Sequence, residues 1–176
     1  MKTMTFCAVI LLSFCAGTAW SQGAAPNDAQ IALIVVTANQ VDVDAGRLAE
    51  SRAHAAEVRA FGRQMVTDHT AVNKSAVELV TKLHVTPEPS GTADSLKKGG
   101  EENLAKLQTL SGAAFDKAYI DHEVAYHEAV LQAMDNTLIP DAQNAELKAL
   151  LVKVRPAFVA HLEHARRIQA ELAKGG

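Results

Sequence analysis

The chain has 176 residues, 48% of them apolar and 21% charged, with two cysteines and a formal net charge of −3. A chain of this size and composition buries a core without disulfide staples, which excludes a disulfide-rich mini-protein and a disordered chain. The 17 basic and 20 acidic residues create no basic field, so we expect no nucleic-acid partner. The low aromatic content of 5% favours closely packed helices over a sheet-rich fold.

Residues 1–21 have the pattern of a secretory signal peptide. Lys2 is followed by an apolar run over residues 6–14 and then by small residues. A membrane-spanning helix needs about 20 apolar residues, and this run is shorter. We therefore expect an exported protein of the periplasm or outer cell envelope, with no transmembrane span in the mature chain.

Cleavage is predicted after Ser21, which makes residues 22–27 a short linker before a domain at 28–173. Both cysteines, Cys7 and Cys15, lie in the leader, so the mature chain has no cysteine chemistry. Lipidation at Cys15 is a minor alternative, because the bulky residue before it is unfavourable for that processing.

Beyond the leader, apolar residues recur with a helical period, and no segment alternates with a period of two. The pattern predicts four long helices and one short one, at residues 28–51, 55–84, 93–110, 113–136 and 141–173. A loop is predicted at 86–91, a second at 137–141, and a kink at Pro156 in the last helix. The expected fold is an all-α, up-and-down bundle.

Histidines interrupt the apolar stripes of three of the long helices: His69, His127 and His161. In the first helix Asp42 lies on one of two alternative stripes. Neutral imidazole and carboxylate are good ligands for transition metals, and a bundle core can bring one residue from each helix to one site. The candidate metal ligands are these residues and their neighbours along the same helices: Asp42, Asp68, His69, His122, His127, His161 and His164.

Heights along the bundle select among these candidates. Asp42 and His69 lie about 15 and 20 Å from the first interhelical break, so they share a level. His127 and His161 lie about 15 and 26 Å from theirs, which is too far apart unless a kink or a misplaced helix boundary intervenes. His122 matches His161 better. The heights therefore favour a site built on His69 and His161 over any particular third ligand.

A structural explanation competes with metal binding. A histidine in a bundle core often packs its ring among apolar side chains and bonds one nitrogen to a carboxylate or carbonyl. For Asp68, a solvated position or a supporting role beside a ligand competes with direct ligation. The sequence has no nucleophile elbow, phosphate-binding loop or His-Glu-x-x-His helix, so it predicts no hydrolase chemistry.

Four sequence blocks resemble the bacterial family called domain of unknown function 4142. They are DVDAGRLA at 42–49, VRAFGRQMVTDHTAVN at 58–73, LSGAAFDKAY at 110–119 and RPAFVAHL at 155–162, and the resemblance covers about 28–170. It implies a ferritin-like helical bundle in an exported bacterial protein, often labelled an outer membrane protein, with no established activity.

The chain departs from that family's pattern at two positions. Asp42 replaces the usual Glu, and Tyr126 precedes His127 where the family has an Asp-His pair. Both Glu-x-x-His motifs of di-iron ferritins are also missing, which argues against ferroxidase chemistry.

The first hypothesis for the function is a periplasmic or cell-envelope bundle that binds copper, zinc or iron through core histidines, in metal handling or stress response. The alternative is a non-catalytic structural or interaction module that binds no metal and whose partner is an envelope protein or a second copy of the chain. If the protein is an enzyme, we expect a metal-dependent oxidoreductase. This hypothesis is less favoured, because a redox-active dinuclear centre needs more core carboxylates than the sequence pattern places.

Overall fold

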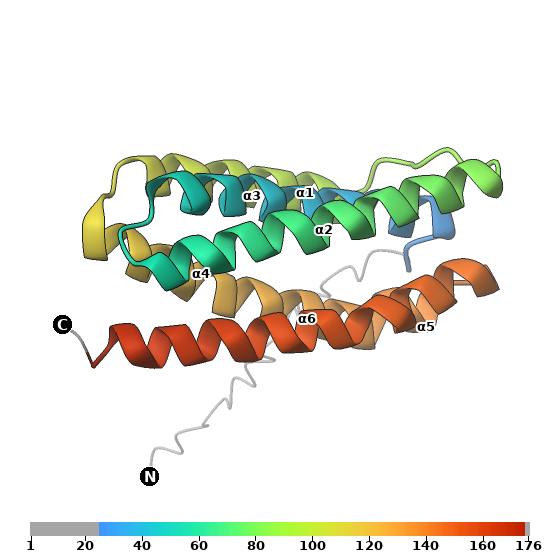
Figure 1. The fold of residues 1–176 in the computed structure, drawn as a ribbon. Coiled ribbons are helices and arrows are strands. Elements are labelled where there is room, and N and C mark those ends of the chain that lie inside the picture. Colours follow the sequence, from blue (N-terminus) through green and yellow to red (C-terminus); the bar gives the residue numbers. More distant parts are fainter. Residues whose placement is uncertain (1–24, 175–176) are drawn as a thin grey trace, which may run out of the picture.

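A computed structural model describes residues 25–174, and the predicted signal peptide lies outside this range. The all-α prediction is confirmed: the described residues form helices and contain no strand (Figure 1). None of these helices is both long and apolar enough to span a membrane. In chain order they are α1 (Asp28–Arg52), α2 (Ala56–Lys82), α3 (Gly91–Gln108), α4 (Gly112–Ala133), the π-helix η1 (Met134–Leu138), α5 (Ile139–Asp141) and α6 (Ala145–Leu172).

Side-chain caps fix where three of the helices begin. Asn27 and Gln30 form a capping box at α1, each side chain accepting a hydrogen bond from the other's backbone N–H. Ser90 accepts from the third residue of α3, and Asn144 accepts from two N–H groups of α6. These contacts satisfy backbone donors that a helix start leaves unpaired, and they place the α1 start where the sequence predicts it.

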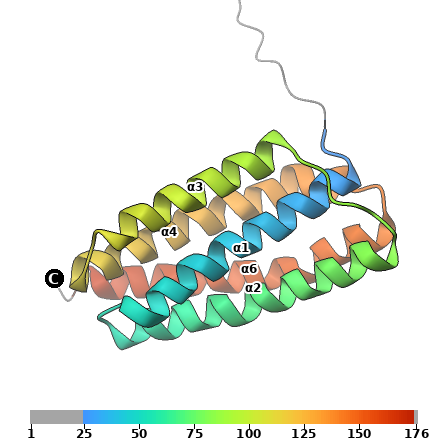
Figure 2. The same ribbon diagram turned by 90° about the horizontal axis from the view of Figure 1, so that it is seen from above.

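The helices form two pairs, α1 with α2 and α4 with α6, joined at the contacts of α1 with α4 and of α2 with α6. This closes a four-helix bundle. Seen from above, α3, α1 and α2 lie side by side in one layer over α4 and α6 (Figure 2). The short helix α3 packs against both α1 and α4, so it covers the junction between them.

Glycines allow α1 and α2 to approach until their backbones touch. A Cβ atom on Gly62 would lie 2.7 Å from the carbonyl oxygen of Gly46, and a Cβ atom on Gly46 would lie 2.7 Å from that of Gly62. Backbone on both sides cannot yield, so no larger residue fits at this crossing. Gly100 has a similar role in α3, where a Cβ atom would lie 2.7 Å from a methyl group of Val41 on α1.

The predicted loop at 137–141 is wrong. The helix of α4 continues through η1 and α5, and the turn lies at 142–144. Pro140 follows directly after the π turn, in which the N–H of Ile139 bonds the carbonyl of Met134 five residues back. A proline that the sequence pattern treats as a helix breaker is thus accommodated inside a helix. The helix α6 also continues through a proline, Pro156, in its interior.

An aspartate from the other helix pair holds the turn at each end of the bundle. The two carboxylate oxygens of Asp116 on α4 accept the backbone N–H groups of His54 and Ala55, between α1 and α2. Those of Asp28 on α1 accept the N–H groups of residues 143–144, before α6. Each pair therefore needs the other to complete its own turn.

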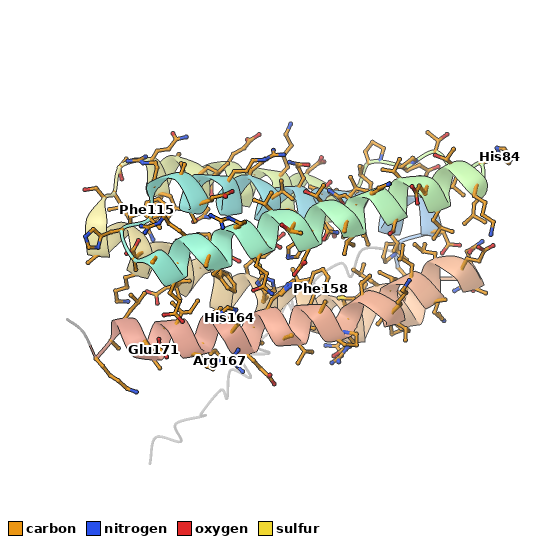
Figure 3. The ribbon with its side chains drawn as sticks, viewed as in Figure 1. His84, Phe115, Phe158, His164, Arg167 and Glu171 are labelled. Atoms are coloured by element: carbon orange, nitrogen blue, oxygen red, sulfur yellow. The ribbon has the colours of Figure 1, made fainter. Side chains whose placement is uncertain are left out.

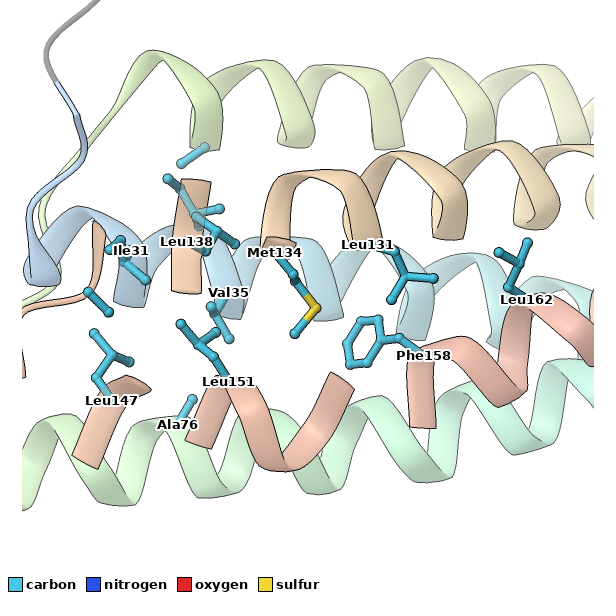
Figure 4. Close-up of a cluster of buried hydrophobic side chains, with 13 residues drawn as sticks. Ile31, Val35, Ala76, Leu131, Met134, Leu138, Leu147, Leu151, Phe158 and Leu162 are labelled. Carbon is cyan, nitrogen blue, oxygen red and sulfur yellow. The ribbon is translucent and has the colours of Figure 1, made fainter. Parts of the chain in front are cut away.

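Two apolar clusters fill the bundle, one toward each end. One lies near the turn that precedes α6 and includes Ile31, Leu147 and Phe158 (Figure 4). The other lies near the turn between α1 and α2 and includes Phe61 and Phe115. Apart from Asp116 at its turn, the buried polar side chains lie between the two clusters, at mid-length of the bundle.

Candidate metal centre

Five ionisable side chains meet in the middle of the core, at least one from each of the four bundle helices. Each is at most 2% exposed, a degree of burial that is rare for charged residues without a partner. We call them the histidine–carboxylate cluster: Asp42 on α1, His69 on α2, Glu123 and His127 on α4, and His161 on α6.

The three imidazole rings of the cluster form a triangle. Their centroids are 5.7 Å apart for His69 and His127, 5.2 Å for His69 and His161, and 5.5 Å for His127 and His161. Asp42 Oδ2 lies 3.4 Å from His69 Nε2. In two overlapping trios, His69–His127–His161 and Asp42–Glu123–His127, one donor atom per residue lies within 4.8 Å of the others. This spacing allows the donors of each trio to meet on one ion.

One nitrogen of each ring is held by a hydrogen-bond acceptor. The partners are Asn39 Oδ1 for His69 Nδ1 at 2.7 Å, the backbone oxygen of Glu123 for His127 Nδ1 at 3.0 Å, and Asp68 Oδ2 for His161 Nε2 at 2.9 Å. The Asn39 amide is itself oriented, because its Nδ2 donates to the carbonyl of Val35. We call the hydrogen-bonded nitrogen of each ring its outer nitrogen and the other one its inner nitrogen. Because its partner is an acceptor, each outer nitrogen carries the hydrogen, which leaves a lone pair on the inner nitrogen of each neutral ring.

The atoms on the inner side of the cluster have no hydrogen-bond partner. Buried polar atoms are nearly always paired, so seven unpaired atoms converging on one place require an explanation. They are Oδ1 and Oδ2 of Asp42, Nε2 of His69, Oε1 and Oε2 of Glu123, Nε2 of His127 and Nδ1 of His161.

The two carboxyl groups are poor anions in this setting. Burial raises the pKa of Asp42 well above its ordinary range, and the nearby charge of Glu123 raises it further. Burial also raises the pKa of Glu123, to about 8. Two neighbouring carboxylates away from water cannot both be charged without a compensating cation, so the metal-free cluster retains a proton at neutral pH.

The imidazoles are poor cations for the same reason. Burial lowers the pKa of His69 well below its ordinary value, and repulsion from His127 and His161 adds to the effect. Burial lowers the pKa of His127 to about 4, and it lowers that of His161 although Asp68 acts in the opposite direction. All three rings are therefore neutral at neutral pH, the state in which imidazole binds metals.

Aromatic side chains wall the cluster on both sides along the bundle axis. The Phe158 ring lies 5.0 Å from that of His69 and 6.0 Å from that of His127, between centroids, and Figure 3 shows it on α6. Tyr119 is fully buried on the other side, with its ring 6.4 Å from the stacked ring of Phe115 and its hydroxyl, also without a hydrogen-bond partner, close enough to Glu123 to counteract the burial-driven rise in the pKa of that carboxyl group. The cluster is thus a polar layer enclosed by apolar material.

A family model for the domain of unknown function DUF4142 matches residues 14–168. The chain belongs to this family. The matched range contains the whole histidine–carboxylate cluster, so the cluster is part of the DUF4142 domain. No curated protein and no solved structure matches the chain.

The structure brings four of the candidate ligands predicted from the sequence together: Asp42, His69, His127 and His161. Asp68 lies outside the cluster and bonds the outer nitrogen of His161, the supporting position considered for it. His122 and His164 contribute nothing to either trio. The His122 ring stacks on Tyr126 at 5.5 Å between centroids, and His164 bonds the side chain of Gln64.

The predicted preference for His122 over His127 is wrong, because the distances were measured from a misplaced turn. The predicted helix ends at residue 136, whereas the helix continues to Asp141 and α6 begins only at Ala145. Measured from these ends, His127 and His161 lie about 21 and 24 Å along their helices, less than one turn apart. The unrecognised π-helix accounts for the error.

Sequence reasoning missed Glu123 and the supporting Asn39. A sequence signal for Glu123 exists: it lies three residues after Ile120 and four before His127, on the same helical face. In di-iron ferritins the motif is Glu-x-x-His. Glu123 and His127 are one residue further apart than in that motif, so a search for the motif does not find them. Asn39 has no comparable signal, because its role depends on where α2 places His69.

Proposed function

We propose that this DUF4142 protein is exported, binds one divalent transition-metal ion in the histidine–carboxylate cluster, and handles metal in the cell envelope. The observation that carries the proposal is the arrangement of hydrogen bonds: every outer imidazole nitrogen has an acceptor, and every inner nitrogen and carboxylate oxygen has none. Acceptors on the outer nitrogens are the usual support of metal-bound histidines, because they fix the tautomer and the ring orientation.

Charge favours a divalent ion. The three rings are neutral, and the two carboxylates, Asp42 and Glu123, together carry two negative charges once their protons leave. One divalent cation makes the buried centre neutral, whereas an empty centre leaves unpaired polar atoms in an apolar core, at a cost of about 1–3 kcal/mol each. A second divalent ion would leave two uncompensated positive charges. The count therefore favours a single ion.

The donor types narrow the choice of metal. Imidazole suits zinc, copper, iron and nickel, carboxylate suits harder ions, and soft Cu(I) prefers sulfur. Met65 and Met134 pack in the two apolar clusters, whereas the donors of both trios are imidazole nitrogens and carboxylate oxygens. The two overlapping trios offer imidazole nitrogens and carboxylate oxygens, a mixed set of donors that fits Fe²⁺ and Zn²⁺ best. Cu²⁺ binds most such sites more strongly in vitro, so the native ion must be identified in protein loaded by the cell.

The test is elemental analysis of tag-free protein purified from a periplasmic fraction without chelators. Wild type is compared with His69→Ala and Glu123→Gln, which change one donor each from two different helices. His54→Ala is the matched control, because His54 is exposed and lies at the turn before α2. Circular dichroism of each variant checks that the helices are intact.

The proposal expects close to one metal ion per wild-type and His54→Ala chain, and a large loss in both cluster variants. Recovery of the wild type from the periplasmic fraction tests the predicted export at the same time. A wild-type protein that is folded and metal-free, and takes up none of Fe²⁺, Zn²⁺ or Cu²⁺ on titration, would contradict the proposal. The chain would then be a structural or interaction module whose histidines complete the core.

A further inference from the structure

Hydrogen-bonded polar side chains connect the buried cluster to the protein surface between α2 and α6. His161 Nε2 bonds Asp68 Oδ2 at 2.9 Å, and Asp68 Oδ2 also accepts from Gln64 Nε2 at 3.4 Å. Gln64 Oε1 in turn bonds His164 Nδ1 at 3.1 Å, and Figure 3 shows His164 on α6 beside α2. We call these four residues the α2–α6 polar chain. It joins the two helices alongside the cluster.

A single hydrogen bond of the polar chain joins a buried side chain to an exposed one. The side chain of His161 is 3% exposed, whereas that of its partner Asp68 is 41% exposed. A cation moving through protein needs polar groups along its way, because apolar surroundings strip its hydration without replacement. Asp68 offers a carboxylate in contact with water at one end, and His161 offers a ligand atom inside the cluster at the other.

The other sides of the bundle offer no such connection among the described residues. Between α1 and α2, the crossing at Gly46 and Gly62 brings backbone against backbone. The junction of α1 with α4 is covered by α3. Between α4 and α6, the polar contacts join Arg166 to Glu128 and Gln169 to Asp121, none of which belongs to the cluster. Both ends of the bundle are filled by the apolar clusters.

We propose that the α2–α6 polar chain is the uptake route for the metal ion, with Asp68 as the residue that first captures the hydrated divalent cation and His161, whose inner Nδ1 has no hydrogen-bond partner, as the ligand that receives it in the cluster. This inference rests on the proposed metal site and adds a kinetic role for a residue outside it. Attraction by the exposed carboxylate raises the local cation concentration at a place where a cluster ligand is a single hydrogen bond from an exposed side chain.

One substitution distinguishes the effect of the Asp68 charge from the effect of its hydrogen bond to His161. In Asp68→Asn the amide oxygen still accepts from His161 Nε2, so the ring keeps its orientation, but the negative charge is lost. Asp44→Asn is the matched control. Its side chain is also 41% exposed and the variant loses the same charge, but Asp44 lies on α1 and pairs with Arg47.

The experiment follows Co²⁺ uptake by metal-free wild type and both variants, using stopped-flow absorption of the bound ion, and then measures equilibrium stoichiometry on the same samples. We expect about ten-fold slower association for Asp68→Asn than for wild type at low ionic strength, a weaker dependence of its rate on salt, and unchanged stoichiometry. Asp44→Asn should match wild type.

Different results would contradict the metal site and the uptake route. If wild type binds no Co²⁺ at equilibrium, the metal site itself is wrong. If wild type binds one ion and Asp68→Asn takes it up at the wild-type rate, the site stands and the uptake route is overturned. The route is also overturned if Asp68→Asn changes only the dissociation rate, because Asp68 would then only orient His161.

Discussion

The two helix pairs of the bundle are held together in different ways. The α1–α2 pair meets backbone to backbone at Gly46 and Gly62, and it supplies two of the five cluster residues. The α4–α6 pair has no such crossing, contains the π-helix, and supplies the other three. The first pair owes its geometry to close contact. The second packs on the first through the two apolar clusters, and polar groups join the two pairs as well, namely the histidine–carboxylate cluster and the two aspartates that hold the turns.

Metal binding should have the largest effect on this arrangement, because the ion joins both pairs. We expect saturating Zn²⁺ to stabilise the wild-type protein by about 4 kcal/mol at a free concentration 1,000 times the Kd. His127→Ala should lose this stabilisation, since His127 belongs to both trios. Thermal unfolding followed by circular dichroism, with metal and after chelation, measures the difference. An equal rise in Tm for wild type and His127→Ala would place the ion elsewhere.

The turn at the α1–α2 end tests how far one pair depends on the other. Asp116→Ala removes the two hydrogen bonds that the buried Asp116 carboxylate accepts from the partly buried N–H groups of His54 and Ala55, so we expect a loss of about 3 kcal/mol in the free energy of unfolding. Asp28→Ala removes the equivalent contacts at the other end. It should cost only about 1 kcal/mol, because Asp28 is only half-buried. Urea unfolding of the metal-free variants compares them. Equal losses would show that burial does not distinguish the two turns.

The crossing of α1 and α2 tests the close contact of the first pair. Gly62→Ala places a methyl group 2.7 Å from a backbone oxygen, and we expect it to destabilise the protein by about 2 kcal/mol although alanine favours helices. Gly99→Ala is the control in α3, because its Cβ would meet nothing within 4 Å. There the same change should stabilise by up to about 1 kcal/mol. If both variants shift the urea midpoint in the same direction, close packing is not what selects glycine at 62.

The contrast between the pairs also explains what the sequence could predict. The helices and the three core histidines are predictable, because a polar residue in an apolar stripe is visible within one helix. The proximity of His127 to His161 is not predictable from the sequence, because it depends on a π turn that continues the helix through Pro140. The role of Asn39 is not predictable for another reason. Its hydrogen bond to His69 joins residues that are thirty positions apart, and no local sequence pattern indicates it.

The cluster without metal should make stability depend on pH with opposite signs on the two sides of pH 6.5. Below that value the imidazoles dominate: their pKa values are lowered in the folded state, that of His127 to about 4, so the unfolded chain takes up protons first and acid destabilises the fold. Above it the carboxylates dominate. The pKa of Glu123 is raised from 4.5 to about 8, so the folded protein keeps a proton that the unfolded chain has released, and stability falls as the pH rises.

Between pH 6.5 and 8 the metal-free wild type should lose about 1.4 kcal/mol per pH unit for each proton retained by the carboxyl pair. Glu123→Gln removes one of the two titrating carboxyl groups and the repulsion that adds to the effect of burial on the pKa of Asp42, so its stability should fall less steeply over this interval. Urea midpoints at several pH values provide the comparison. Binding of a divalent ion reverses the sign, because the ion requires both carboxylates to be ionised and its affinity therefore increases with pH. A metal-free wild type as flat as Glu123→Gln would mean that the two carboxyl groups do not share a water-free site, and the charge argument for a divalent ion would fail with it.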